Sequence, residues 1–300
     1  MNNIKISVVV ATRNRAGSLL RLLNGLSEQI NAPPFVVIIA DNGSSDDTPR
    51  VVENARDRLR THYVREERPG KSRALNAALK FARGELIIFT DDDVIPQPDW
   101  LSQFYSAAQR YSDVNIFGGQ IDVNLADVPS WIKRSFNLMG LLTSAHNYGN
   151  SDIRYNYGQY PFGPNMAIRR HLLIVHEAPY PVHLGPGTDC PVGDESVFFM
   201  KFSPPAAKDR IFLPAARVFH EVEEDNINFH NAVRRCFIAG RGQGCMRLPV
   251  LSEQSEVHSS TFGLILARMS SCKSVRELIC ISARYIGFLV GSLKFHRYNE

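Results

Sequence analysis

The chain has 300 residues, of which 44% are hydrophobic and 21% charged, an ordinary composition for a soluble globular protein. This length suits one large α/β domain with an appendage, or two small domains. The net charge of +4 is too small to indicate nucleic acid as a partner by itself. The charge is unevenly placed, because from residue 231 onward ten Lys and Arg accompany four Glu and no Asp, which makes the C-terminal segment basic.

The five cysteines include no Cys-x-x-Cys pair, which favours reduced thiols over a disulfide framework or a zinc site. No signal-peptide pattern opens the sequence, and no apolar run is long enough to span a bilayer. We therefore expect a cytoplasmic protein.

Strands and helices alternate through the first ninety residues. Continuous apolar runs predict buried strands, and Leu or Ala at helical spacing predicts the helices between them. This alternation is typical of a parallel sheet with right-handed crossovers, as in nucleotide-binding α/β units. The predicted strands are 4–11, 35–40, 62–66 and 86–89, and the predicted helices are 18–27, 48–59 and the residues that follow Gly70-Lys-Ser.

The strand at 86–89 ends abruptly in Asp91, Asp92 and Asp93, and two prolines soon afterward stop it from continuing. Three adjacent carboxylates repel one another unless a cation neutralises them. Ligands of open α/β sheets bind beyond the carboxyl ends of the strands, and Mg²⁺ is usually held by one or two carboxylates plus phosphate. The triplet therefore predicts a divalent cation that carries a phosphorylated ligand; the alternative is a solvated acidic turn.

The second half of the chain is less regular. Residues 128–160 form an aromatic-rich segment that is too apolar to be disordered, and we expect it to be a wall or lid beside the site. The other predicted elements are a helix after Trp100, strands at 116–123, 211–213 and 217–220, a turn and strand at 160–170, a helix begun by Gly193-Asp-Glu-Ser, and a helix at 231–240 closed by Gly240, Gly242 and Gly244.

Six motifs occur in order along the first 240 residues. They are Ser-Val-Val-Val-Ala-Thr-Arg-Asn-Arg, Ile-Ile-Ala-Asp-Asn-Gly-Ser-Ser-Asp-Asp-Thr, Gly-Lys-Ser-Arg-Ala-Leu-Asn-Ala-Ala, Phe-Thr-Asp-Asp-Asp, Gly-Pro-Asn-Met-Ala-Ile-Arg-Arg and Gly-Asp-Glu-Ser. In this ordered combination the chain resembles family 2 of the glycosyltransferases, with the fold called GT-A. The resemblance implies an open, mostly parallel α/β sheet flanked by helices, a nucleotide-sugar donor, a divalent metal (Mn²⁺ or Mg²⁺) and inversion at the anomeric carbon.

The resemblance also implies a domain organisation. We predict a GT-A domain at 1–240, with a nucleotide-sugar-binding half at 1–125 and an acceptor-binding half at 126–240. A helical, basic and amphipathic extension then covers 241–300.

The matching positions assign the nucleoside end of the donor to the first two motifs. Thr12, Arg13 and Asp41 match positions that hold the base and ribose, and Arg15 lies in the same turn. A carboxylate is a good acceptor for an imide N–H, so Asp41 favours uracil and therefore a UDP-sugar. The alternative for Asp41 is a turn residue.

The diphosphate end is assigned to the next two motifs. Lys71 and Arg73 match the segment that closes over the nucleotide, where cations suit a diphosphate. Either could instead be a solvated helix residue. Asp91 and Asp92 match positions against the ribose and diphosphate.

The same resemblance proposes the metal ligands. Asp93 is the firmest of them, and Asp91 is a second. His220 follows a predicted strand where many relatives place a histidine near the diphosphate or metal, although a lone histidine is often structural.

The catalytic base is assigned to Asp194 or Glu195. The family usually has Glu-Asp here, whereas this chain has Asp-Glu. The aligned base is therefore Glu195, one methylene longer than usual, with Asp194 as its rival; it would deprotonate the acceptor hydroxyl. The competing role for either carboxylate is helix capping.

Two other functions compete with this prediction. One is a relative that binds a nucleotide-sugar or glycan without turnover, which the intact acidic motifs oppose. The other is a haloacid-dehalogenase-like phosphatase, which would need an Asp where the chain has Phe198. Processive relatives carry Gln-x-x-Arg-Trp, which the comparable stretch at 231–236 lacks, so we predict transfer of a single sugar.

The tail at 261–297 shows helical, apolar and basic character. Basic amphipathic helices lie in membrane interfaces, so we predict peripheral contact with the cytoplasmic face of a membrane and a glycan or lipid-linked acceptor. The alternative is packing against the catalytic domain or a second copy. No nucleic-acid partner is expected.

Overall fold

The computed structural model describes residues 4–204, 206–222, 227–245 and 272–298. Contacts divide the chain into two compact units. The first, called the α/β unit here, comprises Met1–Asp122, His146–Thr188 and Asp194–Glu221; the second, called the helical unit, comprises Val123–Ala145, Asp189–Gly193 and Val222–Glu300. The predicted domain boundary at residue 240 stays a prediction.

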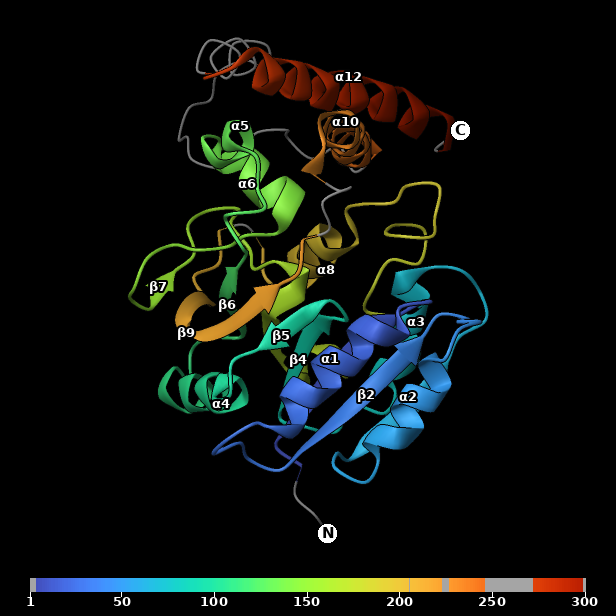
Figure 1. The fold of residues 1–300 in the computed structure, drawn as a ribbon, viewed down its shortest axis with the longest axis vertical. Coiled ribbons are helices and arrows are strands. Elements are labelled where there is room, and N and C mark those ends of the chain that lie inside the picture. The colour runs from blue at the N-terminus through green and yellow to red at the C-terminus, as the bar shows by residue number, and fades with distance from the viewer. Residues whose placement is uncertain (1–3, 205, 223–226, 246–271, 299–300) are drawn as a thin grey trace. The chain divides into compact units, whose positions relative to one another are not determined.

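The described part of the α/β unit is built on a nine-stranded sheet (Figure 1). The strand order is β3-β2-β1-β4-β8-β6-β9-β5, with β7 beside β9. The first four strands in this order run parallel, and β8 is antiparallel to both of its neighbours. The strands are β1 (Ile6–Thr12), β2 (Phe35–Asp41), β3 (Thr61–Arg65), β4 (Leu86–Asp91), β5 (Val94–Pro96), β6 (Ile116–Asp122), β7 (Ile153–Arg154), β8 (Met166–Arg169) and β9 (Arg210–His220).

Helices cover both faces of this sheet because its strands are apolar on both sides. Val8 and Val10 pack in one core with α1, α2 and α4, whereas Val9, between them, packs in a second core with α3, α7 and α8. The helices are α1 (Ala16–Ser27), α2 (Thr48–Ala55), α3 (Lys71–Leu79), α4 (Trp100–Arg110), α7 (Arg170–Leu173) and α8 (Asp194–Phe202), together with the 3-10 turn η1 (Gly163–Asn165).

The parallel register brings three strand ends to one edge of the sheet. Thr12 of β1 lies opposite Asp41 of β2, and Ala11 lies opposite Asp91 of β4. Polar residues that are far apart in the sequence therefore gather at the carboxyl edge, where such sheets bind ligands.

Most predicted elements are present, but a helix and a pair of strands of the α/β unit differ from the prediction, and β5 is not among the predicted strands. Helix α2 ends at Ala55 instead of Leu59. The strands predicted at 211–213 and 217–220 are one continuous strand, β9, because a register shift opposite Gly119 and Gln120 lets it stay paired with β6.

The helical unit contains α5 (Ser130–Lys133), α6 (Phe136–Thr143), α10 (Phe229–Cys245) and α12 (Val275–Tyr298) (Figure 1). Its core includes Leu138, Ala232, Cys236 and Cys280. Cys236 and Cys280 are free thiols in this core. Among the described residues, no helix is both long and apolar enough to cross a membrane.

The prediction that glycines close the helix at 231–240 is wrong, since α10 continues to Cys245. A Cβ on Gly240 would lie 1.7 Å from the carbonyl oxygen of Arg284, and one on Gly244 would lie 2.2 Å from that of Phe288. These glycines therefore permit close contact between α10 and α12 instead of ending the helix. Of the predicted tail at 261–297, residues 261–271 lie outside the described residues.

Candidate active site

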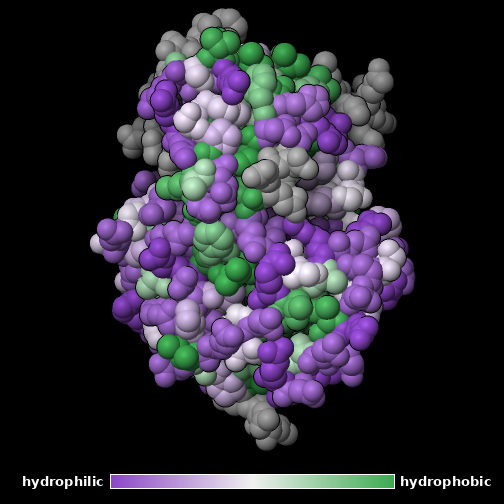
Figure 2. Space-filling model, viewed as in Figure 1, coloured by the Kyte–Doolittle hydropathy of each residue, from purple (hydrophilic) through white to green (hydrophobic). Residues whose placement is uncertain are grey.

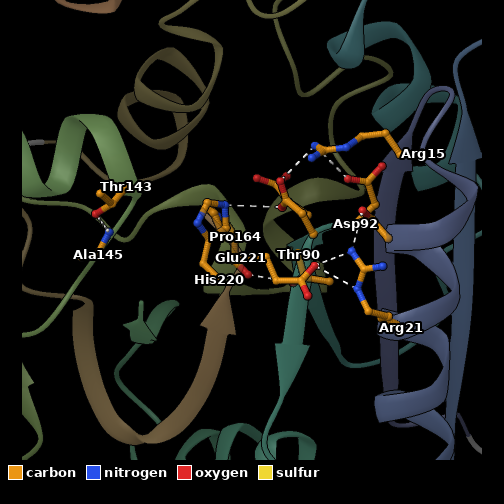
Figure 3. A network of polar contacts seen from close by, with 12 residues as sticks. Arg15, Arg21, Thr90, Asp92, Thr143, Ala145, Pro164, His220 and Glu221 are labelled. Atoms are coloured by element: carbon orange, nitrogen blue, oxygen red, sulfur yellow. Dashed lines mark hydrogen bonds and ion pairs between the residues drawn. The ribbon is translucent and has the colours of Figure 1, made fainter. Parts of the chain in front are cut away.

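The acidic triplet lies at the carboxyl end of β4 and is contacted from β1 and the turn that follows it. Thr12 donates a hydrogen bond from Oγ1 to Oδ2 of Asp92 over 2.7 Å. The guanidinium of Arg15 lies 3.3 Å from Asp92 Oδ1 and 2.9 Å from Asp93 Oδ2, so one cation bridges two carboxylates. Figure 3 shows Arg15 directed at this group.

His220 approaches the triplet from the opposite side (Figure 3). Strand β5 pairs antiparallel with β9, which places Val94 opposite His220. Nε2 of His220 lies 3.5 Å from Oδ1 of Asp93. The next residue, Glu221, donates its backbone N–H to the Asp93 carbonyl over 3.1 Å and forms an ion pair with Arg21. This arrangement holds the end of β9 against the triplet.

Two neighbouring carboxylates of the triplet differ in pKa. Burial raises the pKa of Asp92 to about 6, against the smaller opposing effects of Thr12 and Arg15. Burial also acts to raise the pKa of Asp93, but the interaction with His220 and the charge of Arg15 outweigh it and hold the pKa of Asp93 at about 2. Asp93 is therefore charged at neutral pH.

The donor set suits a divalent metal in part. Oδ1 of Asp93 is buried and has no hydrogen-bond partner in the described residues, and it faces Nε2 of His220. Carboxylate and imidazole are ligands that Mn²⁺ accepts, with diphosphate oxygens and water to complete the coordination. The described residues contain no group of three or more such side chains that could hold a metal. Asp91 faces Lys71 instead, so its role as a ligand stays a prediction.

Lys71 connects the triplet to the second acidic cluster. Its Nζ lies 2.6 Å from Asp91 Oδ1 and 3.9 Å from Glu195 Oε1. Burial acts to lower the pKa of Lys71, but the charges of Asp91, Glu195 and Asp194 outweigh it, and the pKa is raised. Lys71 thus remains a cation between the two predicted motifs.

Glu195 and Asp194 open helix α8 with different environments. The Glu195 side chain is 34% exposed, and its Oε2 accepts the backbone N–H of Gly163 over 3.0 Å. Asp194 is buried, with Oδ2 unbonded and packed close to Gly185. Burial raises the pKa of Glu195 to about 7, and burial also raises the pKa of Asp194. Only Glu195 combines an accessible carboxylate with a pKa near neutrality, the two properties that a general base needs.

Asp41 is completely buried at the end of β2. It accepts the backbone N–H of Ser44 over 2.8 Å and the hydroxyl of Tyr63, and Arg65 lies 3.5 Å from it. Asp41 is thus tied into the loop after β2, which is also the behaviour expected of a turn residue. Its contact with a base stays a prediction.

A cavity of about 320 Å³ lies over the carboxyl edge of the sheet. It brings together most of the predicted donor residues. Arg73 lies elsewhere, on a separate cavity of about 780 Å³ that Glu66 and Arg68 also line. The smaller cavity is lined by Ala11, Thr12, Arg13, Arg15, Asn42, Lys71, Asp91, Asp92, Asp93, Pro186 and Gly187.

Residues 7–175 match the model of a protein family described as glycosyl transferase family 2, and they make up more than half of the chain. The chain belongs to this family. This membership confirms the family that the ordered motifs predicted, and it contradicts the haloacid-dehalogenase-like alternative.

Several curated relatives are similar to this chain over about a third of its length. It is 30% identical over 118 residues to hyaluronan synthase of Pasteurella multocida, a match that covers 39% of this chain and 12% of that protein. It is 37% identical over 105 residues to validoxylamine A glucosyltransferase of Streptomyces hygroscopicus subsp. limoneus, which covers 34% of this chain and 23% of that protein. The matches span less than a quarter of the length of these two relatives.

Solved structures show the same fold over nearly the whole chain. Staphylococcus aureus TarS 1–349 in complex with UDP has a TM-score of 0.58 at 14% identity, covering 99% of this chain and 92% of that one. The mannosyltransferase PcManGT of Pyrobaculum calidifontis, in complex with GDP-Man and Mn²⁺, has a TM-score of 0.57 at 20% identity, covering 98% and 78%. The predicted GT-A fold is thereby confirmed.

The structure adds residues to the site that the motifs did not single out. Gly163 contributes a backbone N–H to Glu195, Tyr63 bonds Asp41, and the segment at 186–187 lines the cavity. Gly163 lies inside a quoted motif, but a backbone donor leaves no mark in a sequence. No sequence pattern predicts that the segment at 186–187 lines the cavity. A hydrogen bond from the Lys71 backbone N–H to the Pro186 carbonyl holds this segment beside α3.

Proposed function

We propose that this glycosyltransferase transfers a single sugar from a UDP-sugar to a hydroxyl acceptor, with a divalent metal and with inversion at the anomeric carbon. The observation that carries the proposal is the arrangement around Lys71. A single half-buried cation lies within 4 Å of both Asp91 in the acidic triplet and Glu195 on α8. Charged groups for the departing diphosphate and a base for the acceptor therefore share one site.

The donor occupies the cavity beyond β1 and β4 in this proposal. Lys71 and Arg15 supply cations at its wall, which suit the diphosphate. Mn²⁺ or Mg²⁺ would be held by Asp93 and His220, with Asp91 as the further candidate, and would stabilise the charge that builds on the leaving group. Glycosyltransferases of the same fold have been solved with UDP or with GDP-Man and Mn²⁺, which supports a nucleotide-sugar donor without deciding its base.

Glu195 acts on the acceptor. Its carboxylate accepts the proton of the acceptor hydroxyl while that oxygen attacks the anomeric carbon and the bond from this carbon to the diphosphate breaks. Attack on the face opposite the leaving group inverts the configuration. Gly163 holds Oε2 of the carboxylate, and Oε1, which lies 3.9 Å from the Lys71 Nζ, takes the proton.

Glycan or polysaccharide biosynthesis is the proposed setting, with a glycan or lipid-linked acceptor.

A membrane surface remains a proposed partner for the C-terminal segment. Val275, Ile279, Ile286 and Leu289 of α12 are exposed hydrophobic residues, the last three 42–54% exposed. Figure 2 shows the hydropathy of the surface residues on one face of the molecule. The four residues of α12 recur at helical spacing on one helix, which is the pattern of an interfacial helix. Binding of the protein to vesicles of anionic lipid tests this membrane contact. We expect the binding to be lost when Ile279 and Ile286 are changed to Gln.

The donor is tested by thermal unfolding of the purified protein with UDP, GDP and dTDP, each with and without Mn²⁺ or Mg²⁺. A ligand that binds only the native state raises the midpoint, and the rise increases with the ratio of its concentration to its Kd. We expect UDP with metal to give the largest rise and Asp93→Ala to remove the metal-dependent part. Absence of any nucleotide effect would refute the donor site, and a preference for GDP would refute the assignment of Asp41.

A further inference from the structure

Gly163 lies in direct contact with the proposed base. Its backbone N–H donates to Glu195 Oε2 over 3.0 Å. A Cβ built on Gly163 would lie 1.8 Å from Oε1, 2.5 Å from Cδ and 2.9 Å from Oε2 of Glu195. The carboxylate thus occupies the volume that any side chain at position 163 would fill.

The backbone at Gly163 cannot withdraw from this contact, because η1 is fixed on its other sides. Thr90 donates from Oγ1 to the Pro164 carbonyl over 2.7 Å, and both residues appear in Figure 3. The fully buried Asn165 accepts the indole N–H of Trp100 over 2.9 Å. Its amide also donates to the carbonyls of Gln120 and Ala216, over 2.8 Å each. Strands β4, β6 and β9 and helix α4 therefore hold η1 in place.

Glu195, in contrast, can move. It lies in the first turn of α8 with a partly exposed side chain, and only its far end meets the position of the Cβ. Gly163 does not have a positive φ, so its backbone conformation accepts alanine without strain. An alanine at 163 would therefore leave the fold intact and displace the carboxylate.

We propose that Gly163 is a positioning residue that fixes the carboxylate of Glu195, and that glycine at this place is what allows the longer glutamate to serve as the base. The inference rests on the proposed function. It explains how the chain uses Glu at a position where the resemblance implies Asp: the extra methylene extends the carboxylate into space that a side chain at 163 would take.

The test is a double-mutant cycle of Gly163→Ala and Glu195→Asp, with Gly17→Ala as the matched control. Gly17 has no atom closer than 3.8 Å to an added Cβ, so its alanine variant is expected to keep full activity. Misplacing a catalytic group by about 1 Å costs on the order of 100-fold, so Gly163→Ala should lower kcat by about that factor. Its KM for the donor and its thermal midpoint should stay close to those of the wild type.

The aspartate is one methylene shorter and does not reach the added Cβ. In the Glu195→Asp background we therefore expect Gly163→Ala to lower kcat by less than about threefold, which is a strong non-additive coupling. Equal losses in both backgrounds would overturn the inference, because a general packing defect does not depend on residue 195. Wild-type kcat in Gly163→Ala would also overturn it.

A crystal structure of Gly163→Ala provides a second measurement if the aspartate variants are too slow to assay. The inference requires the Glu195 carboxylate to have left the residue 163 amide, and an unmoved carboxylate refutes it. The Glu195→Gln variant distinguishes failure of the proposed base from failure of the positioning role of Gly163. Normal turnover by Glu195→Gln would refute the base itself, whereas its inactivity beside a fully active Gly163→Ala would refute only the positioning role.

Discussion

The two acidic clusters of the site contain the same kind of residue but differ in their charged neighbours. Asp93 in the triplet faces both Arg15 and His220, and its pKa is held at about 2. Glu195 on α8 has Lys71 as its nearest cation, 3.9 Å away, and shares that cation with Asp91; burial raises its pKa to about 7. The environment thus keeps one carboxylate charged and leaves the other able to exchange a proton near neutral pH.

The largest expected effect comes from removing the proton acceptor. Glu195→Gln keeps the shape of the side chain and should lower kcat by about 10³-fold, within the range of general-base catalysis. Stabilisation by UDP and metal should be retained, which thermal unfolding measures. Asp194→Asn is the comparison, and we expect a smaller loss because the Asp194 side chain is buried. A larger loss in Asp194→Asn than in Glu195→Gln would exchange the roles of the two residues.

The second effect is the pH dependence of activity. Glu195 must be deprotonated to accept a proton, and its pKa is about 7. The value of kcat/KM should therefore be constant above this pH and fall about tenfold per unit below it. Measurement between pH 5.5 and 9 at fixed saturating metal checks this. A profile that stays flat down to pH 5.5 would contradict the raised pKa.

The smallest expected effect is on stability and concerns Asp92 in the triplet. Its pKa is about 6 in the folded protein, against roughly 3.9 for an unfolded chain. Between these values the native state binds more protons, so this group lowers stability as the pH rises from about 4 to 6. Asp92→Asn removes this cost and should stabilise the metal-free protein by up to about 3 kcal/mol at pH 8.

The gain from Asp92→Asn should be small at pH 4, because Asp92 is then protonated in the folded protein and about half protonated in the unfolded chain. Thermal midpoints of the two proteins at pH 4 and pH 8 test this. The exposed Asp57→Asn controls for loss of a charge in general. An equal change in the thermal midpoint at both pH values would refute the contribution of Asp92. Donor binding by Asp92→Asn should weaken although its stability rises.

Local sequence was sufficient for most of the α/β unit. Residues 86–89 are apolar without interruption and predict a strand buried on both faces, and the structure buries all of β4 except its final Asp91. Local pattern failed at the glycines of α10, because a glycine that ends a helix and a glycine that admits a second helix look alike in one sequence. Only the presence of α12 distinguishes the two.

The sequence by itself determined the fold class, the family and the carboxyl edge at which the acidic triplet lies, because apolar periodicity and ordered motifs are local properties. The tertiary structure decided which charges meet. His220 reaches Asp93 through the pairing of β5 with β9, and Arg73 lies on a different cavity from Lys71 although only two residues separate them. Glu195 meets the backbone of Gly163, a donor that every residue except proline carries. Such contacts join distant segments, and their energies depend on burial and geometry that no local pattern contains.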